Sequence, residues 1–245
     1  FVICLAGTSI AQESPLWMRH CALSPDGTTI AFTYKGDIYT VPSTGGRATQ
    51  ITTNPAFDTE PVWSPDSKQI AFASDRMGSL DVFVVSSEGG APQRLTTHSG
   101  SEKPVAYKDN KHILFTANIA PSAEDAGFPS GQFQQVYEVA VTGGRPAMFS
   151  SMPMECISIN KEGVMLYQDK KGYEDYWRKH QVSPIARDIW TYTPGKKPVY
   201  QKQTTFGGED REPVWSPDGK SFYYLSEEKG SFNIFQRTPG TTTSQ

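Results

Sequence analysis

Short apolar runs recur along the chain at an almost constant spacing. Each follows a turn signal such as Pro-Asp-Gly, and none alternates with polar residues: they lie at residues 30–32, 70–72, 113–115 and 222–224. Unbroken apolar runs of this length, bounded by turn signals, are typical of strands that are buried on both faces. The pattern therefore predicts sheets that stack face to face.

Each run belongs to a longer unit that the chain repeats. A Pro-Asp-Gly turn or a variant of it joins two strands, a second turn precedes a strand of the Asp-Ile-Tyr type, and a Gly-Gly turn leads to a last strand that ends in Leu-Thr or Ile-Thr. These turn residues tolerate the backbone conformations of tight turns. The first two Ser-Pro-Asp triplets begin 40 residues apart, at Ser24 and Ser64. The unit therefore has four short antiparallel strands.

Five units fill the chain, at about residues 20–52, 58–96, 101–150, 153–205 and 210–245. A period of roughly forty residues with four strands is the signature of a propeller. We predict an all-β fold, a β-propeller of four-stranded antiparallel blades over residues 13–245, with about five blades of a ring of six or more. Blades without a neighbour would expose apolar faces, so we expect this chain to be marginally stable or prone to aggregation.

The first twelve residues differ from the repeats. They read FVICLAGTSIAQ and resemble the end of a secretory signal peptide with cleavage near Ala11. We therefore expect residues 1–12 to be a signal remnant and the protein to be exported to the periplasm; a first buried strand is the alternative. Ile3 before Cys4 argues against a lipid anchor. No other segment is long and apolar enough to span a bilayer.

Charge and motifs exclude several classes of function. The 23 basic and 26 acidic residues give a net charge of −3 without long runs of like charge, so we expect no nucleic-acid partner. The chain contains no Gly-x-Ser-x-Gly, His-Glu-x-x-His, Cys-x-x-Cys or phosphate-binding glycine motif. We therefore expect no catalytic residue, no metal site and no cofactor.

Two cysteines remain after the presumed signal. Cys21 and Cys156 fall at nearly equivalent positions of the first and fourth units, on opposite sides of a ring. That separation is too large for a disulfide, and we expect two buried thiols.

The repeat resembles that of two propeller families. The Ser-Pro-Asp-Gly turn, the Ile-Ala-Phe strand and the Gly-Gly turn are similar to the propellers of the Tol-system periplasmic protein and of tricorn-type peptidases. The segment 173–190 looks like an insertion in the N-terminal propeller of tricorn protease and its bacterial homologues, and the matching residues are Trp177, Arg178, Lys179, Arg187, Ile189 and Trp190.

That resemblance implies a function for the chain. In the tricorn family the propellers precede a PDZ domain and a tail-specific type of serine peptidase domain, and they are thought to gate or channel peptides. The family's catalytic residues lie outside this chain, so none is carried over. The resemblance implies a non-catalytic propeller of an exported serine peptidase. The alternatives are a protein-interaction propeller like that of the Tol system and the propeller of a prolyl-oligopeptidase-type enzyme.

The insertion supplies the candidate substrate-binding residues. Aromatic rings and cations suit an extended peptide with a terminal carboxylate, and we expect this role for Tyr176, Trp177, Arg178, Lys179, His180 and Arg187. The alternative is a loop that covers a blade edge, with its cations paired to nearby acids such as Asp188. The implied partners are peptides or unfolded polypeptide, downstream domains of the same chain, and a second copy of the chain.

Two further features are candidates for binding. The segment 120–132 is rich in Pro, Gly and Ala and carries Phe128, which suits either a functional or a merely flexible loop. A group of acids falls just before the innermost strands, where they would ring the channel mouth or simply form a solvated rim: Asp58, Glu60, Asp210 and Glu212, together with Glu102 and Glu155. We expect Trp63 and Trp215 to be core residues.

Overall fold

The computed structural model describes residues 17–119, 133–172 and 182–241. Nineteen strands lie in these residues, and they form five antiparallel sheets. The first sheet contains β1 (Arg19–Leu23), β2 (Thr29–Tyr34), β3 (Asp37–Pro42) and β4 (Thr49–Gln50). The second contains β5 (Asp58–Trp63), β6 (Gln69–Ser74), β7 (Asp81–Ser86) and β8 (Gln93–Arg94).

The remaining sheets repeat this order. The third contains β9 (Lys103–Asp109), β10 (His112–Ala117), β11 (Gln135–Ala140) and β12 (Ala147–Ser150). The fourth contains β13 (Met154–Ile159), β14 (Met165–Asp169), β15 (Ile189–Thr193) and β16 (Val199–Lys202). The fifth has three strands in the described residues, β17 (Asp210–Trp215), β18 (Phe222–Ser226) and β19 (Asn233–Arg237).

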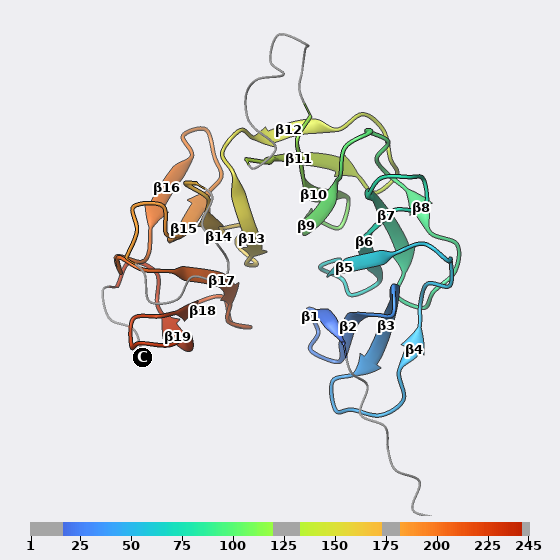
Figure 1. The fold of residues 1–245 in the computed structure, drawn as a ribbon, viewed down its shortest axis with the longest axis horizontal. Helices are drawn as coiled ribbons and strands as arrows, with labels where there is room; N and C mark the ends of the chain where they lie inside the picture. The colour runs from blue at the N-terminus through green and yellow to red at the C-terminus, as the bar shows by residue number, and fades with distance from the viewer. Residues whose placement is uncertain (1–16, 120–132, 173–181, 242–245) are drawn as a thin grey trace, which may run out of the picture.

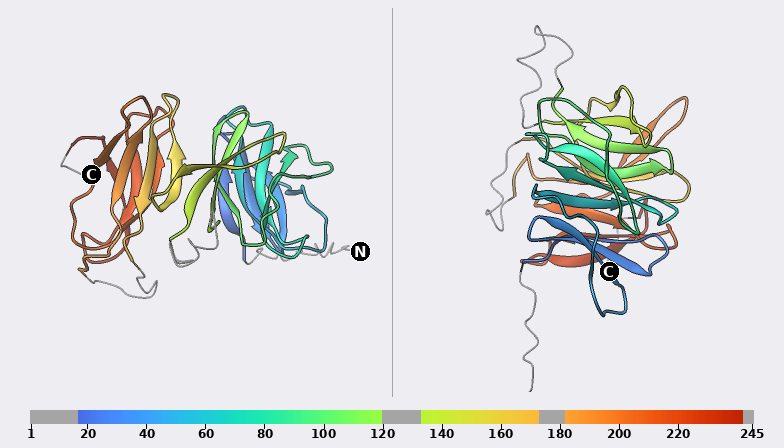
Figure 2. Two further views of the ribbon diagram at one scale, coloured as in Figure 1. Left: turned by 90° about the horizontal axis from the view of Figure 1, so that it is seen from above. Right: turned by 90° about the vertical axis from the view of Figure 1, so that its right-hand side faces the viewer.

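The five sheets are blades arranged around a centre. Figure 1 shows the first strand of each blade facing the centre, and the fourth strand of each of the first four blades at the outer rim. Figure 2 shows the sheets stacked face to face. The predicted all-β propeller with about five antiparallel blades is therefore confirmed, and a sixth blade stays a prediction.

The blades are joined by apolar layers between consecutive sheets. Between the first and second blades, Ala31 and Ile38 pack with Ile70 and Phe72, and all four are buried. Trp63 belongs to the same layer, and its Nε1 donates to the Ala22 carbonyl at 3.0 Å. Comparable layers join the second to the third, the third to the fourth, and the fourth to the fifth blade. The core role expected for Trp63 is confirmed.

Trp215 repeats this arrangement in the fifth blade. It packs on the buried cluster that contains Leu166 and Phe222, and its Nε1 donates to the Val164 carbonyl at 3.2 Å. Each tryptophan therefore links its innermost strand to the blade before it.

The Ser-Pro-Asp turns are held by their own side chains. Ser64 Oγ donates to Asp66 Oδ1 at 2.7 Å and accepts the backbone N–H of Gln69 at 2.9 Å. Ser24 and Ser216 make the same bonds to Asp26 and Asp218. These serines therefore fix hairpin turns, as Ser and Asp side chains commonly do.

The innermost strands share a bulge. In all five described innermost strands, the register shifts near the start of the strand. In four of these strands, one non-glycine residue at the shift has a positive φ: His20 (51°), Glu60 (55°), Cys156 (52°) and Glu212 (53°). A bulge places two residues opposite one and leaves an extra residue out of the ladder. The same unusual backbone conformation therefore recurs at residues of different types.

The cysteines lie at these bulges, and the prediction of buried thiols is wrong. Cys21 and Cys156 are free, as expected from their separation, but both are exposed. Innermost strands have a neighbouring strand on one edge only and face the centre of the ring with the other. Residues at a bulge in such a strand are therefore not enclosed between two sheets.

The opening in the ring exposes apolar side chains. Figure 1 shows the first and fifth blades facing each other across this opening. In the first blade, Leu23 is 57% exposed, and in the fifth blade Val214 and Ile234 are 55% and 73% exposed. These side chains occupy the faces that the other blades bury against a neighbour.

Candidate functional site

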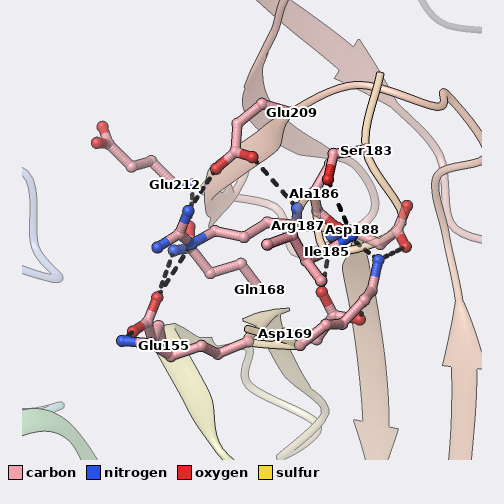
Figure 3. Close-up of polar contacts among 12 residues, drawn as sticks. Glu155, Gln168, Asp169, Ser183, Ile185, Ala186, Arg187, Asp188, Glu209 and Glu212 are labelled. Atoms are coloured by element: carbon pink, nitrogen blue, oxygen red, sulfur yellow. Dashed lines mark hydrogen bonds and ion pairs between the residues drawn. The ribbon is translucent and has the colours of Figure 1, made fainter. Parts of the chain in front are cut away.

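Arg187 holds the base of the insertion to two blades. It lies two residues before β15, and its Nη1 contacts Glu209 Oε1 at 2.6 Å, while its Nε contacts Glu155 Oε2 at 3.2 Å (Figure 3). Its backbone N–H also donates to Glu209 Oε2 at 3.3 Å. Glu155 belongs to β13 of the fourth blade and Glu209 directly precedes β17 of the fifth. One cation thus bridges the junction between these blades.

Glu155 also interacts with a second cation and with a side-chain amide. Lys170 Nζ lies 2.9 Å from its Oε1, and Gln168 Nε2 donates to its Oε2 at 3.0 Å. Burial alone would raise the pKa of Glu155, but Lys170, Gln168 and Arg187 outweigh it and lower the pKa. Glu155 therefore stays charged and keeps Arg187 in place.

Gln168 connects this network to the centre of the ring. Its Oε1 accepts the backbone N–H of Glu212 at 2.7 Å. Glu212 is the residue at the bulge of β17, and its side chain is exposed. Figure 3 shows its carboxylate pointing away from Arg187 and Glu155. The base of the insertion and an exposed carboxylate of the innermost strand β17 therefore depend on the same junction.

The two flanks of the insertion lie against each other and against the fifth blade. A Cβ added at Gly172 would lie 3.0 Å from Ile185 Cγ2, so this glycine permits a close approach. On the far flank, the Ser183 N–H donates to the Gly207 carbonyl at 3.3 Å. The described residues on either side of the segment 173–181 are thus held by packing and by backbone contacts.

Of the predicted substrate-binding residues, the structure places Arg187 alone. Tyr176, Trp177, Arg178, Lys179 and His180 lie outside the described residues. The Arg187 side chain is 16% exposed and its guanidinium is used by two carboxylates. Asp188 pairs with Lys171 and Lys202 instead of Arg187. This geometry favours a positioning role for Arg187, and direct substrate contact by it stays a prediction. The segment 120–132, with Phe128, also lies outside the described residues.

The predicted channel-mouth acids divide into two pairs. Asp58 is fully buried, and Arg76 Nη2 contacts both of its carboxylate oxygens at 2.9 Å. Asp210 is 1% exposed. Their carboxyl groups therefore lie inside the blades. Glu60 is partly exposed and pairs with Lys103 at 2.7 Å.

Glu60 and Glu212 both occupy bulges and begin the same tetrapeptide, Glu-Pro-Val-Trp. The sequence reasoning missed the bulge itself, although this repeated tetrapeptide marks its position in two blades.

Three junctions between described blades also bring two acidic side chains together, with at least one of them buried, and the sequence reasoning missed these pairs. One member begins or directly precedes the third strand of a blade, and the other lies at or next to the start of the following innermost strand: Asp37 with Asp58, Asp81 with Glu102, and Asp188 with Asp210. In each pair one member has a cationic partner, namely Arg76 at Asp58, Arg94 at Asp81 and Lys202 at Asp188.

The other member of each pair has a raised pKa, because burial penalises its charged form. For Asp210, burial raises the pKa to about 6, with Asp188 adding to the rise, while Ser226, Thr204 and Arg237 oppose it. Burial and a neighbouring carboxylate therefore both favour the protonated form of such a carboxyl group.

Within the described residues, no group of three or more His, Cys, Asp or Glu side chains is placed to hold a metal ion. Among the same residues, no helix is long and apolar enough to cross a membrane.

The comparison with known families decides the identity of the propeller. A family described as the tricorn protease N-terminal beta propeller domain matches residues 15–245. The chain belongs to this family. Tricorn protease homolog 1 of Streptomyces coelicolor is 39% identical over 213 residues, which make up 86% of this chain and 19% of the homologue. This tricorn-type propeller therefore spans about a fifth of that relative.

Solved structures agree with this assignment at the level of the fold. The crystal structure of the tricorn protease matches with a TM-score of 0.74 at 16% identity, over 95% of this chain and 22% of that chain. The putative TolB from Agrobacterium tumefaciens matches with a TM-score of 0.72 at 14% identity, over 95% of this chain and 80% of that chain. The resemblance of the repeat to both tricorn-type and Tol-type propellers is thus confirmed.

Proposed function

We propose that this tricorn-type propeller is a non-catalytic module of an exported serine peptidase and that it admits or binds peptides for downstream PDZ and peptidase regions. The family membership and the 39% identity to a tricorn protease homologue support the class of protein. The chain spans 19% of that homologue, so the peptidase activity is assigned to regions outside it.

The observation that carries the proposal is the anchoring of the insertion. Arg187, Glu155 and Glu209 fix its base at the junction of two blades, and the same junction orders the bulge of Glu212 at the centre of the ring. Structural support of this kind is what a binding segment needs for a defined position. Arg178 and Lys179 are the cations that would meet a peptide carboxylate.

The test uses the complete protein and an unfolded polypeptide as substrate. The double substitution Arg178→Ala/Lys179→Ala should lower kcat/KM at least tenfold, because charge-assisted hydrogen bonds contribute about 1.5–3 kcal/mol each. The matched control is Lys196→Ala/Lys197→Ala, which removes the same charge from two exposed residues between β15 and β16. Equal losses in both variants, or no loss in the first, would contradict the proposal.

A Tol-type interaction propeller is the second candidate, favoured by the match to 80% of the putative TolB chain. A protein partner that binds without being cleaved would support it. If the protein were instead an enzyme of the prolyl-oligopeptidase type, the complete protein would contain an α/β-hydrolase domain with a Gly-x-Ser-x-Gly motif. Export is tested separately, by expressing the complete precursor and locating the product: processing near Ala11 with periplasmic recovery supports it, and retention of an unprocessed product contradicts it.

A further inference from the structure

A pocket opens between the first and second blades. Its volume is ≈ 380 Å³, and both blades supply its walls. Because strands alternate in direction, the Pro-Asp turn and the Gly-Gly turn of a blade lie on the same side, and both kinds of turn contribute to the pocket. Binding sites for small molecules have volumes of about 300–1,000 Å³, so this pocket fits a compact ligand.

The walls of the pocket are fixed by contacts between the blades. Asp26 N–H donates to Ser67 Oγ at 3.3 Å, and Trp63 Nε1 donates to the Ala22 carbonyl at 3.0 Å. Asp26 and Trp63 both line the pocket. Its shape is therefore present without a ligand.

Asp26 is a structural acid of the pocket wall. Its Oδ1 accepts bonds from Ser24 Oγ, Thr28 N and Thr28 Oγ1 at 2.6, 3.0 and 2.8 Å. These bonds, with that of Ser24 the strongest, lower the pKa of Asp26 to about 2. The turn already uses this carboxylate.

Two other charged side chains of the pocket have no such partners. Arg47 directly follows the Gly45–Gly46 turn of the first blade, and Glu88 directly precedes the Gly89–Gly90 turn of the second. Among the described residues, neither side chain makes an ion pair or a side-chain hydrogen bond. The pocket thus presents one cation from one blade and one anion from the other. Thr40, Thr49 and Ser87 also line the pocket.

We infer that this pocket binds a short zwitterionic peptide, of the size of a dipeptide, with the peptide carboxylate at Arg47 and its α-ammonium at Glu88. An arginine guanidinium matches a carboxylate with two parallel hydrogen bonds. A ligand with a single charge would leave either Arg47 or Glu88 without a partner. The charges and the volume of the pocket indicate a zwitterion of this size, independently of the proposed function. The choice of a peptide among such zwitterions rests on the proposed function.

The chain offers a matched control for Arg47. Arg145 follows the Gly143–Gly144 turn of the third blade, at the same place in the repeat, and it is also exposed. It does not line the pocket. Replacing either arginine removes the same charge from the same kind of turn.

The experiment is a calorimetric titration of the 245-residue chain with alanyl-alanine. We expect saturable binding, an affinity at least tenfold weaker in Arg47→Ala, a similar loss in Glu88→Gln, and a change within twofold in Arg145→Ala. Acetyl-alanyl-alanine amide, which lacks both charges, should not bind. Acetyl-alanyl-alanine keeps the carboxylate and should be sensitive to Arg47→Ala but not to Glu88→Gln.

Three results would overturn the inference: no saturable binding by a chain with the β-sheet circular dichroism of a folded propeller, equal binding of the doubly blocked dipeptide, or equal losses in Arg47→Ala and Arg145→Ala. None of these depends on Arg178 or Lys179. A failure here therefore leaves the test of the proposed function intact, and the reverse also holds.

Discussion

Arg187 Nη1 contacts Glu209 Oε1 at 2.6 Å across the junction between the fourth and fifth blades. The two side chains are 16% and 13% exposed, and they belong to a network that continues through Glu155 and Gln168 to the bulge at Glu212. The contact thus joins the base of the insertion to the last described blade.

Removing one partner of this pair should destabilise the junction. In Glu209→Gln, Arg187 keeps a neutral hydrogen-bond acceptor but loses one of its two carboxylate partners. We expect the free energy of unfolding to fall by about 1–3 kcal/mol. Urea denaturation measures it. The control is Glu138→Gln, which breaks the more exposed pair with Lys108 and should cost less than about 1 kcal/mol. Equal costs would show that the junction does not depend on Glu209.

Asp210 should make the stability of the chain depend on pH. Its pKa in the folded chain is about 6, above the ordinary value of 3.8, so the folded state binds its proton more tightly than the unfolded state does. Its contribution is fully present below the ordinary pKa, decreases as the pH rises, and is lost above about 6. We expect the chain to lose on the order of 1–3 kcal/mol from this group between those two values.

The variant Asp210→Asn isolates this effect, because the amide cannot ionise. Its unfolding free energy should change less with pH than that of the unmodified chain. The stability of the variant relative to the unmodified chain should be greatest at neutral pH. Thermal unfolding at pH values from below the ordinary pKa of Asp210 up to neutrality measures both. Glu228→Gln alters an exposed carboxylate of the same blade and should leave the pH dependence unchanged. A parallel curve for Asp210→Asn would contradict the assignment.

The serine of the Pro-Asp turn should contribute to stability in every blade that has it. Ser64→Ala leaves the N–H of Gln69 and the carboxylate of Asp66 without the Ser64 hydroxyl, and we expect a loss of about 1–2 kcal/mol by chemical denaturation. Ser101→Ala changes an exposed serine and should stay within about 0.5 kcal/mol of the unmodified chain. An unchanged stability in Ser64→Ala would mean that the turn forms without its side-chain bonds.

The open faces of the first and fifth blades should promote self-association. Ile234 is 73% exposed on one of these faces, and replacing it with lysine should shift the chain toward the monomer in sedimentation velocity. Met77 is 60% exposed in the loop between β6 and β7, away from both faces, so Met77→Lys is the control. A monomeric chain with a cooperative unfolding transition would contradict the expectation.

Local signals in the sequence predicted most of the fold. The turns around Asp26 and Asp66 depend on side chains within five residues, and an apolar run buried on both faces looks the same in every blade. Trp63 was assigned to the core correctly because its position in the repeat is unambiguous. These features need no knowledge of the neighbouring blade.

The candidate site was harder to predict because its contacts join residues far apart in the sequence across the junction between neighbouring blades. Arg187 meets Glu209 at a separation of 22 residues and Glu155 at 32, and no local pattern identifies either partner. Asp58 and Asp210 looked like rim acids, but their burial depends on the preceding blade covering them. The exposure of Cys156 likewise follows from a bulge that its own side chain does not specify.

The bulge also has a consequence for changing this protein. Histidine, glutamate, cysteine and glutamate occupy the same backbone conformation in four blades, at His20, Glu60, Cys156 and Glu212. The conformation is set by strand pairing, and it accepts an imidazole, a carboxylate or a thiol. Each of these four blades therefore provides one position in its innermost strand where a side chain can be exchanged for another chemical group while the backbone conformation is kept.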